Sequence, residues 1–186
     1  SNIGMRIVYG LMNELPGVWC ERVFAPWGDM EEKMREHAIP LYALESHDPV
    51  RAFDLIAFTI GYEMSYTNIL NMLDLGRIPF YAKDRDEEYP IICAGGPCAY
   101  NPEPLADFID FFMLGEGEEI MMEVMDVYRR VKQNGGKKDD FLREIVVIEG
   151  IYVPKFYYVE YHEDGTIKSF TKNDEHAPDK IKKRII

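Results

Sequence analysis

Three apolar runs of this 186-residue chain lead into glycine, and each is followed by a segment with helical periodicity. The runs are DLIAFTI (54–60), IICAGG (91–96) and DFFMLGEGEE (110–119). Strands that alternate with helices predict a parallel sheet. Right-handed crossovers place all the strand-to-helix loops at one edge of such a sheet, where doubly wound folds bind their ligands. The sequence therefore predicts an α/β fold with a candidate site at the carboxyl ends of its strands.

Other elements are predicted from apolar spacing and from turn residues. Helices are expected at residues 3–15, 29–38, 65–76, 118–133 and 137–145. The stretch VWCERVFA (18–25) has the composition of a strand. The run at 54–60 is almost wholly apolar, which predicts a central parallel strand buried on both faces.

The character of the chain changes beyond residue 134. Residues 151–171 predict two antiparallel strands, IYVPKFYYVEY and TIKSFTK, joined by a turn at Glu163-Asp164-Gly165. The last residues, DKIKKRII, are basic and unpatterned and are expected to form a linker. We therefore expect an α/β domain at residues 1–149, followed by a hairpin and linker at 150–186.

The start of the chain is unusual for this class of fold. A doubly wound sheet normally opens with a strand, whereas the helical pattern here begins at residue 3. In the flavodoxin-like order 2-1-3-4-5 the first strand is central, so its loss would leave a gap. We expect the gap to be closed directly or by pairing with a second chain in a homodimer.

The composition narrows the class of partner. With 47% apolar residues the chain can bury a core, and its net charge of −12 and pI near 4.8 disfavour nucleic acid, whose phosphates it would repel. No apolar stretch reaches the roughly 20 residues that span a bilayer, and no secretory signal opens the chain. The sequence predicts a cytoplasmic protein.

Familiar catalytic and metal-binding motifs are absent. The dinucleotide pattern G-x-G-x-x-G fails, since GEGEEI has Ile120 where the third small residue is needed, and neither a phosphate loop nor a G-x-S-x-G elbow is present. Three cysteines (Cys20, Cys93 and Cys98) fit neither a disulfide framework nor a zinc site and are expected to be reduced. The four histidines are scattered and are expected to be solvated.

The loops after the three runs carry the candidate binding residues. Backbone amides at this edge of a sheet can hold a phosphate or a nucleotide-like tail. Glycine after a strand also serves tight turns, and Ser65 or Thr67 is expected simply to cap the next helix. Glu118 and Glu119 suit the dipole of the helix that they open and would repel an anion there.

The ordered set DLIAFTIGYEMSYTNILNML and IICAGGPCAYNPEPLADFIDFFMLGEGEE resembles the N-terminal cobalamin (B12)-binding-type domain of B12-dependent radical S-adenosylmethionine (SAM) proteins. With WCERVFAPWGDME and IPLYALESHDP included, the chain is similar to an uncharacterised bacterial family within that class. The resemblance implies a three-layer, Rossmann-like fold of cobalamin-binding or flavodoxin-like topology.

The resemblance also implies a set of cofactor-binding residues: Thr59, Gly61, Ser65, Gly95, Gly96, Pro97, Gly115, Glu116 and Gly117. Thr59 stands where the family has a strand-end hydroxyl. Gly95 and Gly96 would leave bare backbone for the nucleotide tail of cobalamin, and the loop at 115–118 would close the far side of the pocket.

The C-x-x-x-C-x-x-C triplet that holds a [4Fe-4S] cluster and leaves one iron for SAM is absent, as is the D-x-H-x-x-G motif of histidine-ligated cobalamin proteins. The resemblance therefore implies that the cluster and SAM belong to a barrel of the same polypeptide, outside this chain. No catalytic and no metal-binding residue is predicted in this piece, although the parent protein is expected to be a radical SAM enzyme.

Three functions stay open at this point. The first is a cobalamin-binding domain that presents its cofactor, or a substrate, to the barrel. The second is a degenerate domain without cofactor that serves docking or substrate recognition, with Tyr62, Tyr66 and Tyr100 plugging the edge. The third, ranked last, is a stand-alone enzyme of flavodoxin type.

Overall fold

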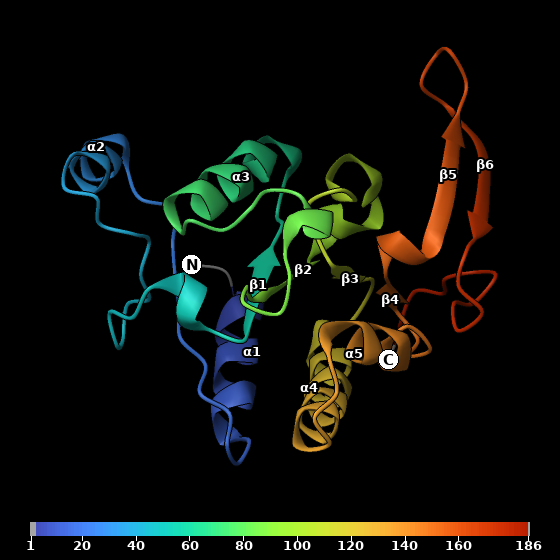
Figure 1. The fold of residues 1–186 in the computed structure, drawn as a ribbon, viewed down its shortest axis with the longest axis horizontal. Coiled ribbons are helices and arrows are strands. Elements are labelled where there is room, and N and C mark those ends of the chain that lie inside the picture. The colour runs from blue at the N-terminus through green and yellow to red at the C-terminus, as the bar shows by residue number, and fades with distance from the viewer. Residues whose placement is uncertain (1–2, 186) are drawn as a thin grey trace.

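The computed structural model describes residues 3–185. Its main sheet holds β1 (Leu55–Thr59), β2 (Ile91–Gly95), β3 (Phe111–Met113) and β4 (Ile151–Tyr152), in that order. The first three strands are parallel, and β4 pairs with β3 in the antiparallel sense. The predicted α/β class is confirmed: helices flank a mostly parallel sheet, and a separate antiparallel hairpin follows it (Figure 1).

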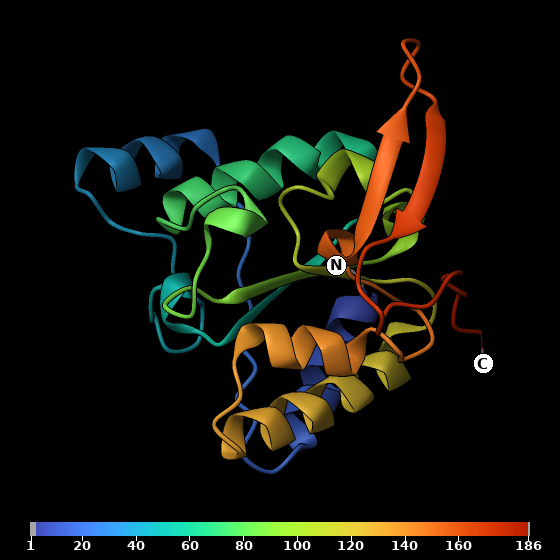
Figure 2. The same ribbon diagram turned by 45° about the vertical axis from the view of Figure 1, so that its right-hand side comes forward.

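The helices are α1 (Ile3–Glu14), α2 (Gly28–Glu36), α3 (Tyr66–Leu75), α4 (Gly117–Gln133) and α5 (Lys138–Ile145). All lie within a few residues of their predicted positions. Helix α3 covers one face of the sheet, with α2 beside it, whereas α1, α4 and α5 lie on the other face (Figures 1 and 2). Within residues 3–185 no helix is long and apolar enough to cross a bilayer.

The core sits where β2 and β3 are covered on both faces. Cys93 of β2 and Phe111 and Phe112 of β3 are fully buried. Ile120 and Val124 of α4 are also fully buried and belong to the same core cluster. Because β2 and β3 are buried on both faces, their sequences are continuously apolar and do not alternate between apolar and polar residues.

Strand β1 is not central, so the prediction for residues 54–60 is wrong in that respect. It lies at the edge of the sheet, and its Ala57 and Thr59 are exposed. Its core contacts are mainly on one face, where Ile56 is buried and Phe58 is partly buried, although Leu55 on the other face is also partly buried against the core.

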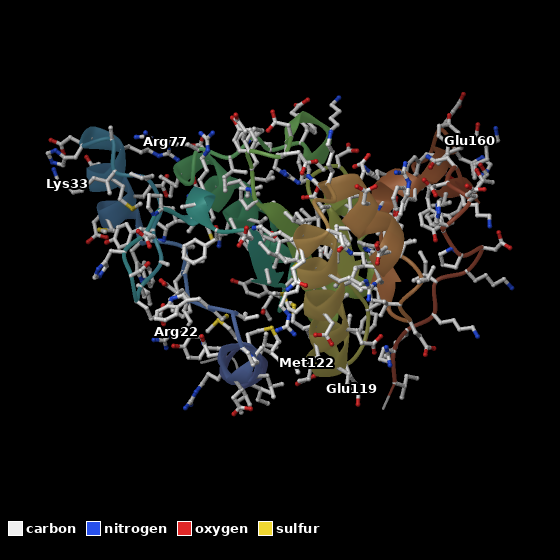
Figure 3. The ribbon with its side chains drawn as sticks, turned by 60° about the horizontal axis from the view of Figure 1, so that its bottom comes forward. Arg22, Lys33, Arg77, Glu119, Met122 and Glu160 are labelled. Carbon is white, nitrogen blue, oxygen red and sulfur yellow. The ribbon has the colours of Figure 1, made fainter. Side chains whose placement is uncertain are left out.

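The predicted strand at 18–25 is also wrong. This segment is extended, but it joins no sheet, because its backbone bonds to a loop and to α1: Leu44 N donates to Arg22 O (2.9 Å), and Cys20 N donates to Asn13 Oδ1 (3.0 Å). Arg22 N also donates to Glu45 Oε2 (2.9 Å). Arg22 also stacks over Tyr9 of α1, and Figure 3 shows it on the flank of the molecule.

The C-terminal hairpin consists of β5 (Tyr157–Tyr161) and β6 (Ile167–Lys172). Its predicted turn is confirmed, since Gly165 has φ +83° and donates to His162 O (3.0 Å). The single strand predicted at 151–161 is wrong, because a short turn at Pro154–Phe156 divides it and sends β4 into the main sheet. The hairpin projects away from the sheet (Figures 1 and 2).

A buried charge cluster braces the sheet just before β3. Asp110 accepts from Arg85 Nη2 (3.1 Å) and from Ile92 N (2.8 Å), and its other oxygen pairs with Lys138 Nζ (2.7 Å). Arg85 also donates to the carbonyls of Pro79, Phe80 and Phe108. These side chains are at most 8% exposed. Through its contacts, the cluster joins α5 and the loop before β2 to the sheet.

Candidate functional site

The carboxyl ends of the parallel strands bring the predicted site residues to one edge of the sheet. Thr59 is the register partner of Gly95, and Ile60 N donates to Gly95 O (2.8 Å). A side chain on Gly95 would point toward Met113, at the end of β3. The three glycine-bearing loops therefore start from neighbouring positions, as the pattern of strands and helices predicts.

Gly96 lies against the chain itself. It has φ +101°, and a Cβ placed there would lie 2.8 Å from Ile60 O and 3.1 Å from Ile60 N. Cys98 N donates to the same Ile60 oxygen (3.2 Å). Gly95 differs, because the atom nearest to its added Cβ is Met113 Cε at an ordinary 3.5 Å. The bare backbone of Gly96 is thus occupied by the turn that leaves β1.

Gly115 is covered by the C-terminal strap, as we name residues 181–185. It has φ +119°, and a Cβ there would lie only 2.0 Å from Arg184 O. Arg184 N donates to Leu114 O (2.9 Å), and Glu116 N donates to Arg184 O (3.3 Å), which makes one parallel bridge. The stretch predicted as an unpatterned linker therefore adds backbone pairing at the end of β3.

The Arg184 side chain holds the strap in place. Its Nη2 donates to Glu123 Oε1 (2.5 Å), its Nη1 lies 3.7 Å from Glu119 Oε2, and its Nε donates to Glu149 O (3.3 Å). Figure 3 shows Glu119 on α4. The strap also reaches Tyr100, whose ring lies 4.7 Å from Lys183 Nζ. Sequence reasoning missed Arg184.

Other predicted site residues remain open to solvent. Thr59, Gly61, Pro97 and Glu116 are exposed, and a Cβ at Gly61 or Gly117 would meet no atom within 4 Å. The cap expected of Ser65 is wrong for that residue, because its hydroxyl donates to Tyr62 O (2.7 Å) rather than to an amide of α3.

The three tyrosines expected to plug the edge do not behave alike. Tyr62 and Tyr100 are 59% and 50% exposed, so neither ring is buried as a plug would be. The Tyr66 hydroxyl, by contrast, is buried and has no hydrogen-bond partner within residues 3–185. Burial raises the pKa of the Tyr66 hydroxyl, with further contributions from Cys98 and Glu63. This phenol is therefore a neutral donor at neutral pH, placed just after β1.

No cluster that could hold a metal is formed by the described residues. Among residues 3–185, no group of three or more His, Cys, Asp or Glu side chains could bind one. The three cysteines are free, and burial raises the pKa of the Cys93 and Cys98 thiols. The four histidines are exposed, as predicted: His37, His47, His162 and His176.

The chain matches a known protein family over most of its length. The family model described as radical SAM proteins, N-terminal, matches residues 4–154, a range that contains all of β1 to β4. This chain belongs to that family. The predicted radical SAM relationship is therefore confirmed, and the cobalamin-binding character of this radical SAM N-terminal domain stays a prediction.

One curated relative is much longer than the stretch that it shares with this chain. An uncharacterized protein of Methanocaldococcus jannaschii is 34% identical over 99 residues, which cover 50% of this chain and 20% of the relative. The match thus spans only about a fifth of that relative's length. No solved structure matches this chain.

Proposed function

We propose that this radical SAM N-terminal domain is a docking and positioning module that carries no cofactor at its glycine loops. The observation behind the proposal is that two of these loops already contact the chain's own backbone, Gly96 at Ile60 and Gly115 at Arg184. A nucleotide tail laid on Gly115 would have to displace the strap. The residues at these two positions therefore do not fit the cobalamin that the resemblance implied.

The positioning role is supported by how the strap is held. Arg184 ties it by backbone bonds to the loop after β3 and by its guanidinium to two glutamates of α4. Because both the backbone and the side chain of Arg184 are held, the direction in which the chain leaves the sheet is fixed. We expect the [4Fe-4S] cluster and SAM, which supply the radical chemistry of this class, to be bound by a barrel of the parent protein that this domain orients.

A titration tests the proposal. Hydroxocobalamin is added to the wild-type chain and to Arg184→Ala, whose loosened strap would uncover Gly115, and the absorption spectrum is followed. An unchanged cobalamin spectrum with both proteins is expected. A saturable spectral change with either protein would overturn the proposal that these loops carry no cofactor.

The docking role needs a second measurement, made on the parent protein. Arg184→Ala is expected to increase the maximum dimension found by small-angle X-ray scattering, because the strap no longer fixes the exit of the chain. Lys182→Ala is the matched control, since Lys182 is an exposed strap residue. Equal scattering profiles for Arg184→Ala and wild type would contradict the positioning role.

The second candidate function is that of a ligand-binding domain that presents cobalamin or a substrate to the barrel. It is favoured by the buried, unpaired Tyr66 hydroxyl, because such groups usually have a partner. Thr59 and Gly61 lie open nearby along the chain. This function predicts that Tyr66→Phe weakens binding of the ligand, whereas without a ligand the substitution is close to neutral for stability.

A further inference from the structure

The outer edge of β1 has hydrogen-bonding groups that no strand of the described chain uses. Asp54 O accepts from Ile91 N (3.0 Å), and Ile60 N donates to Gly95 O (2.8 Å), so even-numbered residues of this stretch face β2. In a parallel ladder the residues of a strand alternate between its two sides. The N–H and C=O groups of Leu55, Ala57 and Thr59 therefore point away from β2, where no strand of residues 3–185 pairs with β1.

An apolar hollow borders this edge on the α3 side. It is lined by Ile56 and Phe58 of β1, by Val23 of the extended segment 18–24, and by Leu41 and Ile78 among others. Val23 thus faces β1 across a space lined by apolar side chains. The extended segment is hydrogen-bonded through Arg22 to Leu44 and Glu45.

We infer that β1 and residues 18–24 border a slot for one further parallel strand, and that its occupant is the stretch of the same polypeptide that leads into α1. The strand would pair with Leu55, Ala57 and Thr59 and would place an apolar side chain over the hollow. The unpartnered edge, the apolar lining and the extended opposite wall all fit a single strand better than a second sheet or a helix.

The orientation of α1 is the argument for this occupant. In Figure 1, α1 lies beside α4 on one face of the sheet, and both helices run downward, opposite to the direction of β1. Helix α4 follows the parallel strand β3 and returns along the sheet in the opposite direction. An equivalent strand before α1 would run parallel to β1 and end where α1 begins, which places it in the slot. The exposed Ile3 and Ile7 of α1 also leave its apolar stripe partly uncovered.

Hydrogen exchange of the β1 amides tests the inference. In the 186-residue chain, the amides of Leu55, Ala57 and Thr59 should exchange rapidly, while Ile56 and Phe58, which donate to β2, are protected. In the parent protein all five amides should be protected, the first three by about 100-fold or more relative to the shorter chain. Unchanged rapid exchange of these three amides in the parent protein would overturn the inference.

Two variants distinguish filling of the slot from a general loss of stability. Ala57→Pro removes an amide that faces the slot, and proline is tolerated on edge strands, so the 186-residue chain should keep its melting temperature. The parent protein should lose melting temperature and β1 protection. Ala57→Val keeps the amide and should keep both. Equal effects of Ala57→Pro on the two proteins, or concentration-dependent protection in the parent protein that indicates pairing with a second copy, would contradict the assigned occupant.

Discussion

Gly95 and Gly96 are neighbours in the chain, yet their surroundings differ. Gly96 needs its positive φ and has no room for a Cβ beside Ile60, whereas Gly95 has ordinary contacts with Met113. If a cofactor lay against both glycines, an alanine substitution at either position would be disruptive. If internal packing alone matters, substitution should be disruptive at Gly96 and not at Gly95, and this difference gives a prediction.

Gly96→Ala is expected to lower the free energy of unfolding by about 1 to 3 kcal/mol, because alanine is strained at this φ and its Cβ would overlap the Ile60 oxygen. Gly95→Ala, the matched control, should change it far less. Urea denaturation of the two variants measures both. Equal losses at the two positions would argue against the packing explanation of Gly96.

Asp110 is the second residue with a specific consequence. It is the one carboxylate that pairs with both Arg85 and Lys138 in the buried cluster before β3. Asp110→Ala should lower the free energy of unfolding by about 3 to 5 kcal/mol, since it leaves two buried cations unpaired. Asp54→Ala, which removes an exposed pair with Lys132, should cost under about 1 kcal/mol. Chemical denaturation that ranks the two variants equally would disprove this.

At the scale of elements, local patterns predicted the helices but not the strand pairing. The helix boundaries follow from apolar spacing and from residues such as Gly76, which lie within one segment. VWCERVFA has strand composition, but a strand also needs a neighbour, and residues 18–24 bond to a loop instead. For the same reason β1 was predicted to be a central strand: an apolar composition does not reveal which strands lie beside it.

The extended segment should loosen in acid. Burial favours a raised pKa for the Glu45 carboxyl, but hydrogen bonds from the Arg22 amide and guanidinium outweigh it and hold this pKa below its ordinary value of 4.5. A lowered folded-state pKa means that the stabilisation is complete above pH 4.5 and is lost as pH falls through the folded value.

Glu45→Gln should therefore be less stable than wild type at pH 7, and the difference should shrink as pH falls below about 4.5. Urea midpoints at a series of pH values measure this. Asp29→Asn in α2, whose carboxylate accepts from the adjacent Met30 N, is the control for the loss of one carboxylate charge. A pH-independent difference for Glu45→Gln would contradict the assignment.

For the whole molecule, long-range contacts decide what the sequence could not predict. The edge that gathers the glycine loops follows from the strand-helix order, so their common position was predictable, whereas their role as a binding site stays a prediction. The strap that covers Gly115 was not predicted, because 68 residues lie between Gly115 and Arg184 and no local pattern in the sequence marks their contact. Tyr152 and Glu103, which attach the hairpin, have the same kind of distant partnership.

The hairpin is expected to depend on Glu103. This carboxylate accepts from the hydroxyls of Tyr152 (2.6 Å) and Tyr161 (2.8 Å). Glu103→Ala leaves the buried Tyr152 hydroxyl unpaired, at a cost of about 1 to 3 kcal/mol, and frees β5 at its outer end. Hydrogen exchange over residues 157–172 should accelerate. Glu163→Ala, at the exposed tip, should leave the exchange of these strands unchanged, and the same result for Glu103→Ala would count against this attachment.

The sequence of β1, LIAFT, contains neither charge nor proline. Natural proteins usually protect a free sheet edge with lysine, proline or a bulge, because an unprotected edge invites strands of other molecules to add to it. The 186-residue chain should therefore self-associate at high concentration more readily than its parent protein does. By the inference above, the stretch that leads into α1 would cover this edge, so its presence governs the solubility of the domain as well as its fold.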